Sequence, residues 1–148
     1  MSQISRKFIS PDIEKKIYEI FVSSISQATD PQDTVSFIND LLSPVERKML
    51  AKRVAIAFLL MKGGYTYEKI SGMLKVSFGT IAKINSTLQT QGKGYRKIVA
   101  ELLDKQAVKR VLGEILDAFL LIPPKGTNWG RWKKEMAERE AKRNSPLL

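Results

Sequence analysis

The chain has 148 residues, enough for one domain with a hydrophobic core, and its 25 Lys and Arg outnumber 15 Asp and Glu, giving a net charge of +10. The sequence contains no cysteine and no histidine, which excludes disulfides, thiolate or imidazole metal sites and the serine–histidine or cysteine–histidine pairs of hydrolases. It also lacks a Gly-rich phosphate loop. We therefore predict a protein that is not an enzyme and that uses neither a metal nor a cofactor.

Hydropathy and charge point to a cytoplasmic protein with a polyanionic partner. The longest apolar run, residues 54–61, is too short to cross a membrane, and the N-terminus lacks the apolar segment of a signal peptide. Residues 1–42 carry a net charge of −2, so residues 43–148 carry +12. Such a concentrated basic excess favours nucleic acid as the partner over a surface that is basic only for solubility.

The apolar spacing predicts helices along the whole chain and no strand. Ser10-Pro11-Asp12 opens the first helix, and Asp30-Pro31 opens the second. Ser43 and Glu46 form a capping box that starts a long helix, and Gly63-Gly64 ends it. Outside the motif described below, we expect helices at about residues 11–28, 31–42, 43–62, 95–103, 108–121 and 129–143. We predict a helical domain over residues 1–122, ended by Pro123-Pro124, and a basic C-terminal extension over residues 123–148.

The long helix is apolar on every side over residues 54–61, VAIAFLLM, and must therefore be enclosed. We expect one subunit of this size to be too small to surround it, so the pattern favours a homodimer with interlocking helices. The alternative is a central helix inside a compact monomer.

Residues 66–88, TYEKISGMLKVSFGTIAKINSTL, are typical of a helix-turn-helix. Its apolar positions have the spacing of two short helices that cross at a steep angle. Ser77 is the expected cap of the second helix, and Lys75 stands in the turn where a left-handed glycine is usual. The predicted core positions are Ile70, Leu74, Val76, Ile81 and Ile84.

The second helix of the motif presents a mixed outward surface that fits a DNA major groove. The alternative is a helical hairpin that binds nothing. The predicted outward residues are Phe78, Gly79, Ala82, Lys83 and Ser86.

Residues 38–88 resemble the tryptophan repressor family, through the segments INDLLSPVER, LAKRVAIAFLLMKGG, TYEKI and GTIAKINSTL. The resemblance implies an all-α, intertwined homodimer that places two recognition helices in successive major grooves of a palindromic operator. It also implies a set of DNA-binding residues, although Glu68 and Ser71 stand where the family has basic residues. The DNA-binding set is Thr66, Tyr67, Lys69, Lys75, Ser77, Phe78, Gly79, Thr80, Ala82 and Lys83, and Lys93, Arg96 and Lys97 are further candidates for phosphate contacts.

The ligand pocket implied by the resemblance is altered in this sequence. Arg53 and Thr80 match pocket residues of the tryptophan-responsive repressor, but Lys83 replaces an arginine and lacks its flat stacking surface. Ile84 replaces a glycine, and its side chain would occupy the space of the indole. We therefore predict a vestigial pocket of Arg53, Thr80, Lys83 and Ile84, and a regulator for which tryptophan is not the corepressor. Whether another small molecule acts as its effector is left open.

Three functions are compatible with this sequence. We favour a homodimeric transcriptional regulator that binds double-stranded DNA, a repressor that occupies its operator. The alternative is a small basic RNA-binding or ribosome-associated helical protein, although only Phe78 and Tyr67 offer rings for base stacking. The third is an interaction adaptor that keeps the helix-turn-helix as a scaffold.

In the C-terminal extension, Trp129, Trp132 and Met136 form an apolar ridge that either docks on the protein or accompanies a phosphate-binding arm.

Overall fold

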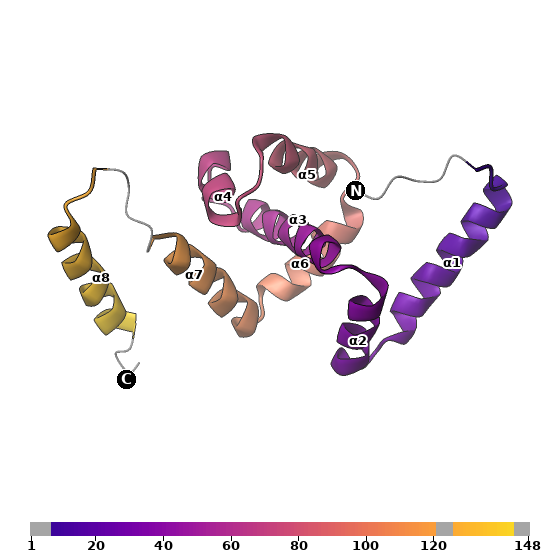
Figure 1. The fold of residues 1–148 in the computed structure, drawn as a ribbon, viewed down its shortest axis with the longest axis horizontal. Helices are drawn as coiled ribbons and strands as arrows, with labels where there is room; N and C mark the ends of the chain where they lie inside the picture. The colour runs from indigo at the N-terminus through magenta and orange to yellow at the C-terminus, as the bar shows by residue number, and fades with distance from the viewer. Residues whose placement is uncertain (1–6, 121–125, 144–148) are drawn as a thin grey trace. The chain divides into compact units, whose positions relative to one another are not determined.

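The computed structural model describes residues 7–120 and 126–143, and within these ranges every regular element is an α-helix (Figure 1). The prediction of an all-α protein is therefore confirmed. Among the described residues, no helix has the length and the apolar character needed to cross a membrane. The helices are α1 (Pro11–Gln27), α2 (Pro31–Leu41), α3 (Pro44–Lys62), α4 (Tyr67–Leu74), α5 (Phe78–Thr90), α6 (Lys93–Leu103), α7 (Gln106–Leu120) and α8 (Trp129–Arg143).

The helix starts that depend on capping side chains were predicted correctly. At the start of α3, the backbone N–H of Ser43 donates to a carboxylate oxygen of Glu46 over 2.9 Å, and the N–H of Glu46 donates to the Ser43 hydroxyl over 3.3 Å. Asn128 caps α8 by accepting the N–H groups of Gly130 and Arg131. These bonds satisfy backbone donors that have no partner inside the helix.

Two predicted helix starts were two residues too late. Helix α6 begins at Lys93 because Gly92 is its N-cap and accepts the N–H of Arg96 over 2.8 Å. Helix α7 begins at Gln106, since the carbonyl of Lys105 already accepts the N–H of Val108. The predicted last residue of that helix, Leu121, the domain boundary after residue 122 and the stop at Pro123-Pro124 lie outside the described residues.

The chain divides into two compact units, Met1–Val54 and Ala55–Leu148, and the division falls inside α3. In the first unit, α1, α2 and the first part of α3 line an apolar pocket of about 200 Å³. Many large apolar side chains of this unit remain exposed in the single chain. They are Ile13, Ile17, Ile20, Phe21, Val22 and Ile25 on α1, Val35, Ile38 and Leu41 on α2, and Val45, Met49, Leu50 and Val54 on α3.

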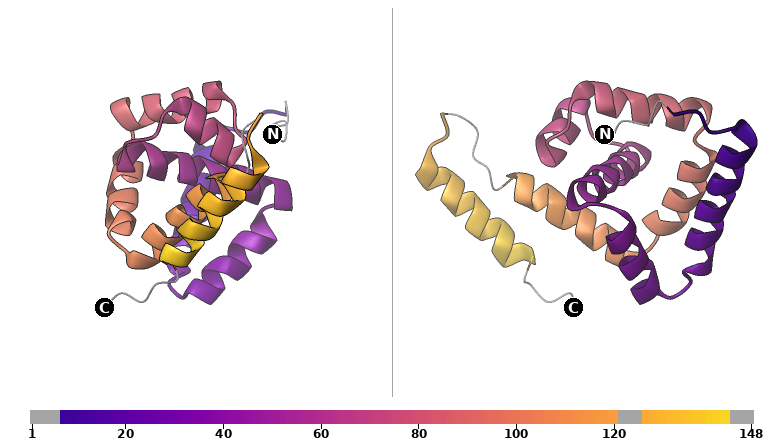
Figure 2. Two further views of the ribbon diagram at one scale, coloured as in Figure 1. Left: turned by 90° about the vertical axis from the view of Figure 1, so that its left-hand side faces the viewer. Right: turned by 45° about the vertical axis from the view of Figure 1, so that its right-hand side comes forward.

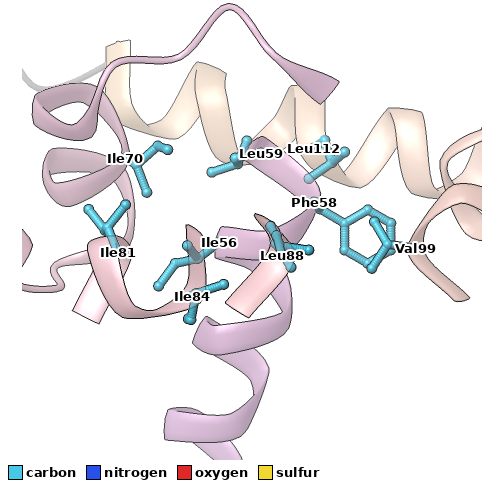
Figure 3. Packing of buried hydrophobic residues seen from close by; sticks show 10 residues of the cluster. Ile56, Phe58, Leu59, Ile70, Ile81, Ile84, Leu88, Val99 and Leu112 are labelled. Carbon is cyan, nitrogen blue, oxygen red and sulfur yellow. The ribbon is translucent and has the colours of Figure 1, made fainter. Parts of the chain in front are cut away.

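In the second unit, four helices form a closed ring of contacts around the last part of α3: α4 packs on α5, α5 on α6, α6 on α7, and α7 on α4. Figure 2 shows the end of α3 surrounded by these helices. The buried cluster, shown in Figure 3, takes side chains from all five helices. Its members are Ile56, Ala57, Phe58, Leu59, Ile70, Ile81, Ile84, Leu88, Val99 and Leu112.

The expectation that one chain cannot enclose residues 54–61 was wrong for the middle of that segment. Ile56, Ala57, Phe58 and Leu59 are buried within the single chain. The reason is the ring of α4 to α7, whose last member supplies the buried Leu112. Val54, in contrast, is exposed.

Candidate nucleic-acid interface

Helices α4 and α5 form the predicted helix-turn-helix, joined by a turn at Lys75–Ser77. Lys75 ends α4 in the left-handed conformation, with φ 52° and ψ 58°, where glycine is usual. The Ser71 hydroxyl donates a hydrogen bond of 2.7 Å to the carbonyl of Val76, which ties α4 to the turn. The hydrogen bond of the Ser71 side chain therefore stabilises a turn in which the left-handed conformation of Lys75 is unfavourable.

Each helix of the motif begins with a capping hydroxyl. The Thr66 hydroxyl accepts the N–H of Lys69 over 3.2 Å, and the Ser77 hydroxyl accepts the N–H of Thr80 over 3.2 Å. The side-chain oxygens of Ser77 and Thr80 are also hydrogen-bonded to each other, 2.9 Å apart. The predicted cap at Ser77 is confirmed.

The predicted core positions of the motif are buried or packed on the core. Ile70, Ile81 and Ile84 are buried, and Leu74 and Val76 are partly buried against the same cluster. Figure 3 shows Ile70 and Ile81 facing each other across the two helices, with Ile84 close to Ile56 of α3. These contacts fix the crossing of α4 and α5 and leave one face of α5 exposed.

The exposed face of α5 contains the residues that the sequence places outward: Phe78, Gly79, Ala82, Lys83 and Ser86. A Cβ atom on Gly79 would meet only the Ser77 hydroxyl, at 3.9 Å, so the space in front of this part of α5 is open. Apart from Phe78 and Lys83, the residues of this face have small side chains. An α-helix with such a surface can approach base edges in the major groove closely.

Tyr67 and Asn85 make a contact between α4 and α5 that the sequence analysis did not identify. The amide nitrogen of Asn85 donates a partly buried hydrogen bond of 2.9 Å to the Tyr67 hydroxyl. The Tyr67 ring also makes an edge-to-face contact with Phe78, with ring centroids 6.4 Å apart and an interplanar angle of 82°. Tyr67 was predicted to bind DNA, and in the structure both its hydroxyl and its ring contact residues of α5.

Two of the basic side chains predicted to contact DNA, Lys69 and Arg96, contact aromatic or backbone partners, and so does Lys62, which was not among the predicted residues. The ammonium groups of Lys62 and Lys69 lie 5.9 and 6.0 Å from the ring centroid of Tyr65, within the range of cation–π attraction. The guanidinium of Arg96 donates to the carbonyl of Leu88 near the end of α5. Arg96, a candidate for phosphate contact, therefore has a structural partner as well.

Helix α7 packs on α4, the first helix of the motif. Phe119 of α7 lies against Gly72 of α4, where a Cβ atom would come within 2.7 Å of the ring. The small residue lets α7 approach α4 closely. The contact was not predicted from the sequence, in which a glycine inside a helix is the signal that marks it.

The residues of the predicted vestigial pocket lie in both units of the chain. Arg53 is half-buried on α3 and, with Ser43 and Glu46, lines an open pocket of about 510 Å³ in the first unit. Thr80, Lys83 and Ile84 lie on α5 in the second unit, where Ile84 is only 6% exposed and belongs to the core.

Known proteins similar to this chain carry one common description. Residues 16–103 match the model of a family described as Trp repressor protein. The Trp operon repressor homolog of Photobacterium profundum is 35% identical over 85 residues, which cover 57% of this chain and 82% of that protein. The Trp operon repressor homologs of Vibrio parahaemolyticus and Vibrio campbellii are 28% and 29% identical over 99 residues, 67% of this chain and 96% and 99% of theirs.

No solved structure is significantly similar to the chain. The family match ends at residue 103, so α7 and α8 lie beyond it. It nevertheless spans more than half of the chain and includes the whole helix-turn-helix. The chain therefore belongs to the Trp repressor family of helix-turn-helix, DNA-binding transcription regulators.

Proposed function

We propose that this protein is a transcriptional repressor that acts in the cytoplasm as a homodimer, occupies a palindromic operator and does not use tryptophan as its corepressor. The observation that carries the proposal is the exposed face of α5, the second helix of a helix-turn-helix whose crossing is fixed by a buried core. In such motifs the second helix enters the major groove, and its first residues contact base edges.

Within this proposal, the first turns of α5 contact bases and the surrounding hydroxyl and ammonium groups contact phosphates. The net charge of +12 over residues 43–148 supports a polyanionic partner. The basic extension, residues 123–148, is proposed to be a segment separate from the helix-turn-helix domain. The proposed DNA contacts are Thr66, Tyr67, Lys69, Lys75, Ser77, Phe78, Gly79, Thr80, Ala82 and Lys83.

The apolar surface of the first unit supports the homodimer. Ile17 and Ile20 of α1 and Val35 of α2 are more than half exposed in the single chain. An extended exposed apolar surface on a soluble protein marks an interaction site, because its contact with water is unfavourable. A second copy presents the same surface and can cover it in a self-complementary interface, which would pair two recognition helices.

The burial of Ile84 supports regulation without tryptophan. Its side chain is already part of the hydrophobic core that holds α5, together with Ile81 and Ile56. A ligand that occupied this position would have to displace it and open the core. Lys83, next to it, offers a point charge and no planar surface for stacking on an indole.

The proposal is tested by measuring binding, over a range of salt concentrations, to three nucleic acids: a selected duplex, a mixed-sequence duplex and single-stranded RNA. The full chain should select tight-binding sites from a random duplex library and bind them more tightly than mixed-sequence duplex or single-stranded RNA. Lys83→Ala should weaken binding to the selected duplex roughly tenfold, about 1.4 kcal/mol. Lys109→Ala removes the same charge from an exposed position on α7 and is the matched control. Equal binding to RNA and to every duplex, with no difference between the two variants, would contradict the proposal.

A further inference from the structure

Phe78 is a large apolar residue whose exposure is not explained by the packing of the single chain. It is the first residue of α5, and its side chain is 53% exposed. Within residues 66–90, all of which the structure describes, no other large apolar residue is exposed. The core of the motif is completed by Ile70, Ile81 and Ile84, and Phe78 is not part of it.

The exposed ring is nevertheless held in place. Its neighbour is the Tyr67 ring, in the edge-to-face contact described above, and Tyr67 is in turn fixed by the hydrogen bond from Asn85. Phe78 thus rests on a support that spans both helices of the motif. A side chain that is already ordered loses less conformational entropy when it binds a partner, so the arrangement favours use of Phe78 in recognition.

The surface around Phe78 contains one side chain that usually reads a purine, Lys83, which can donate to guanine. Residues 78–83, FGTIAK, contain no arginine, and none of the asparagine or glutamine side chains that read adenine through paired hydrogen bonds. Asn85 follows, but it is half-buried and bonded to Tyr67. Ala82, one turn after Phe78, extends an apolar surface on the exposed face. The apolar group that the major groove offers to such a surface is the 5-methyl group of thymine.

We infer that Phe78 contacts the 5-methyl group of a thymine in the major groove and thereby sets a preference for thymine at one position of each half-site. The inference rests on the proposed DNA-binding function and adds to it the base group that is recognised. The open space in front of Gly79, next to Phe78, lets the start of α5 come close enough to the bases for this contact.

Replacing thymine by deoxyuridine tests the inference, since it removes only the methyl group. Duplexes selected by the full chain from a random library are resynthesised with deoxyuridine at each thymine in turn. For the unmodified protein, one position per half-site should show an affinity loss of about three- to fivefold. For Phe78→Ala, thymine and deoxyuridine at that position should bind equally. Circular dichroism should show that this exposed substitution leaves the fold unchanged.

Ile98→Ala is the matched control, because Ile98 on α6 is also 53% exposed and apolar. This variant should keep the full sensitivity to deoxyuridine. If Phe78→Ala binds the duplexes but retains the sensitivity of the unmodified protein, the inference is overturned while the DNA-binding function stands. If the unmodified protein binds no duplex, the proposed function fails and the inference with it.

Discussion

Phe119 of α7 lies so close to Gly72 of α4 that a Cβ atom on the glycine would come within 2.7 Å of its ring. The contact joins the first helix of the helix-turn-helix to a helix that lies beyond the family match. It closes the ring of α4 to α7 around the end of α3. The packing of α4 therefore depends on a segment that the family's own pattern does not include.

Gly72→Ala should lower the stability of the protein, although alanine normally stabilises a helix by about 1 kcal/mol relative to glycine. The new Cβ atom would push the Phe119 ring out of its place in the contact. Gly113→Ala in α7 is the control, because a Cβ atom there meets nothing within 4 Å and should stabilise the helix. Urea unfolding measures both free energies. The same sign for both variants would contradict the importance of the contact.

The hydrogen bond between Asn85 and Tyr67 should contribute measurably to stability. Asn85→Ala and Tyr67→Phe each remove one partner and leave the other partly buried without this bond. A double-mutant cycle with both changes should give a coupling free energy of about 0.5–1.5 kcal/mol. A coupling of zero would mean that the bond does not hold α4 against α5.

Ile84→Ala should lower the free energy of unfolding by about 2–5 kcal/mol, because it removes a nearly buried side chain and leaves a cavity. Ile98→Ala makes the same change at an exposed position and should alter stability by less than about 1 kcal/mol. Thermal unfolding compares the two variants. Similar losses in both would show that Ile84 does not stabilise the core.

L-Tryptophan should not bind to the protein. Isothermal titration at millimolar ligand should give only the heat of dilution, since Ile84 is part of the hydrophobic core and, by the proposed correspondence with the tryptophan-responsive repressor, its side chain would occupy the space of the ligand. The variant with Ile84→Gly and Lys83→Arg would restore space and a stacking surface, and weak binding is expected there at a loss of stability. Specific binding at micromolar tryptophan to the unmodified protein would overturn the proposal of regulation without tryptophan.

Analytical ultracentrifugation at micromolar protein should give about twice the chain mass of 16.7 kDa. Ile20→Asp should shift the equilibrium to monomer. Ile20 is 67% exposed in the single chain, and burying an unpaired charge at this position in an interface would be unfavourable in free energy. Gln106→Asp adds the same charge at an exposed polar position of α7, outside the proposed interface, and should leave the dimer intact. A monomer for the unmodified chain would remove the paired-half-site proposal.

The sequence determined the features that depend on residues close together in the chain. The capping pair Ser43 and Glu46, the cap at Ser77 and the apolar positions of the helix-turn-helix were predicted because each involves contacts within one or two helical turns. For the same reason the all-α class and the presence of each helix could be predicted. The start of α6 was missed because no side chain caps its first turn. The start of α7 was missed because the bond that marks it runs between backbone groups, from the N–H of Val108 to the carbonyl of Lys105.

Only the tertiary structure decided what covers each apolar face. Periodicity shows that residues 54–61 must be enclosed, but it does not show by which helices, and the ring of α4 to α7 buries Ile56 to Leu59 within one chain. The bond between Asn85 and Tyr67 and the contact between Phe119 and Gly72 join residues far apart in the sequence. Such contacts depend on the path of the whole chain, and no local pattern encodes that path.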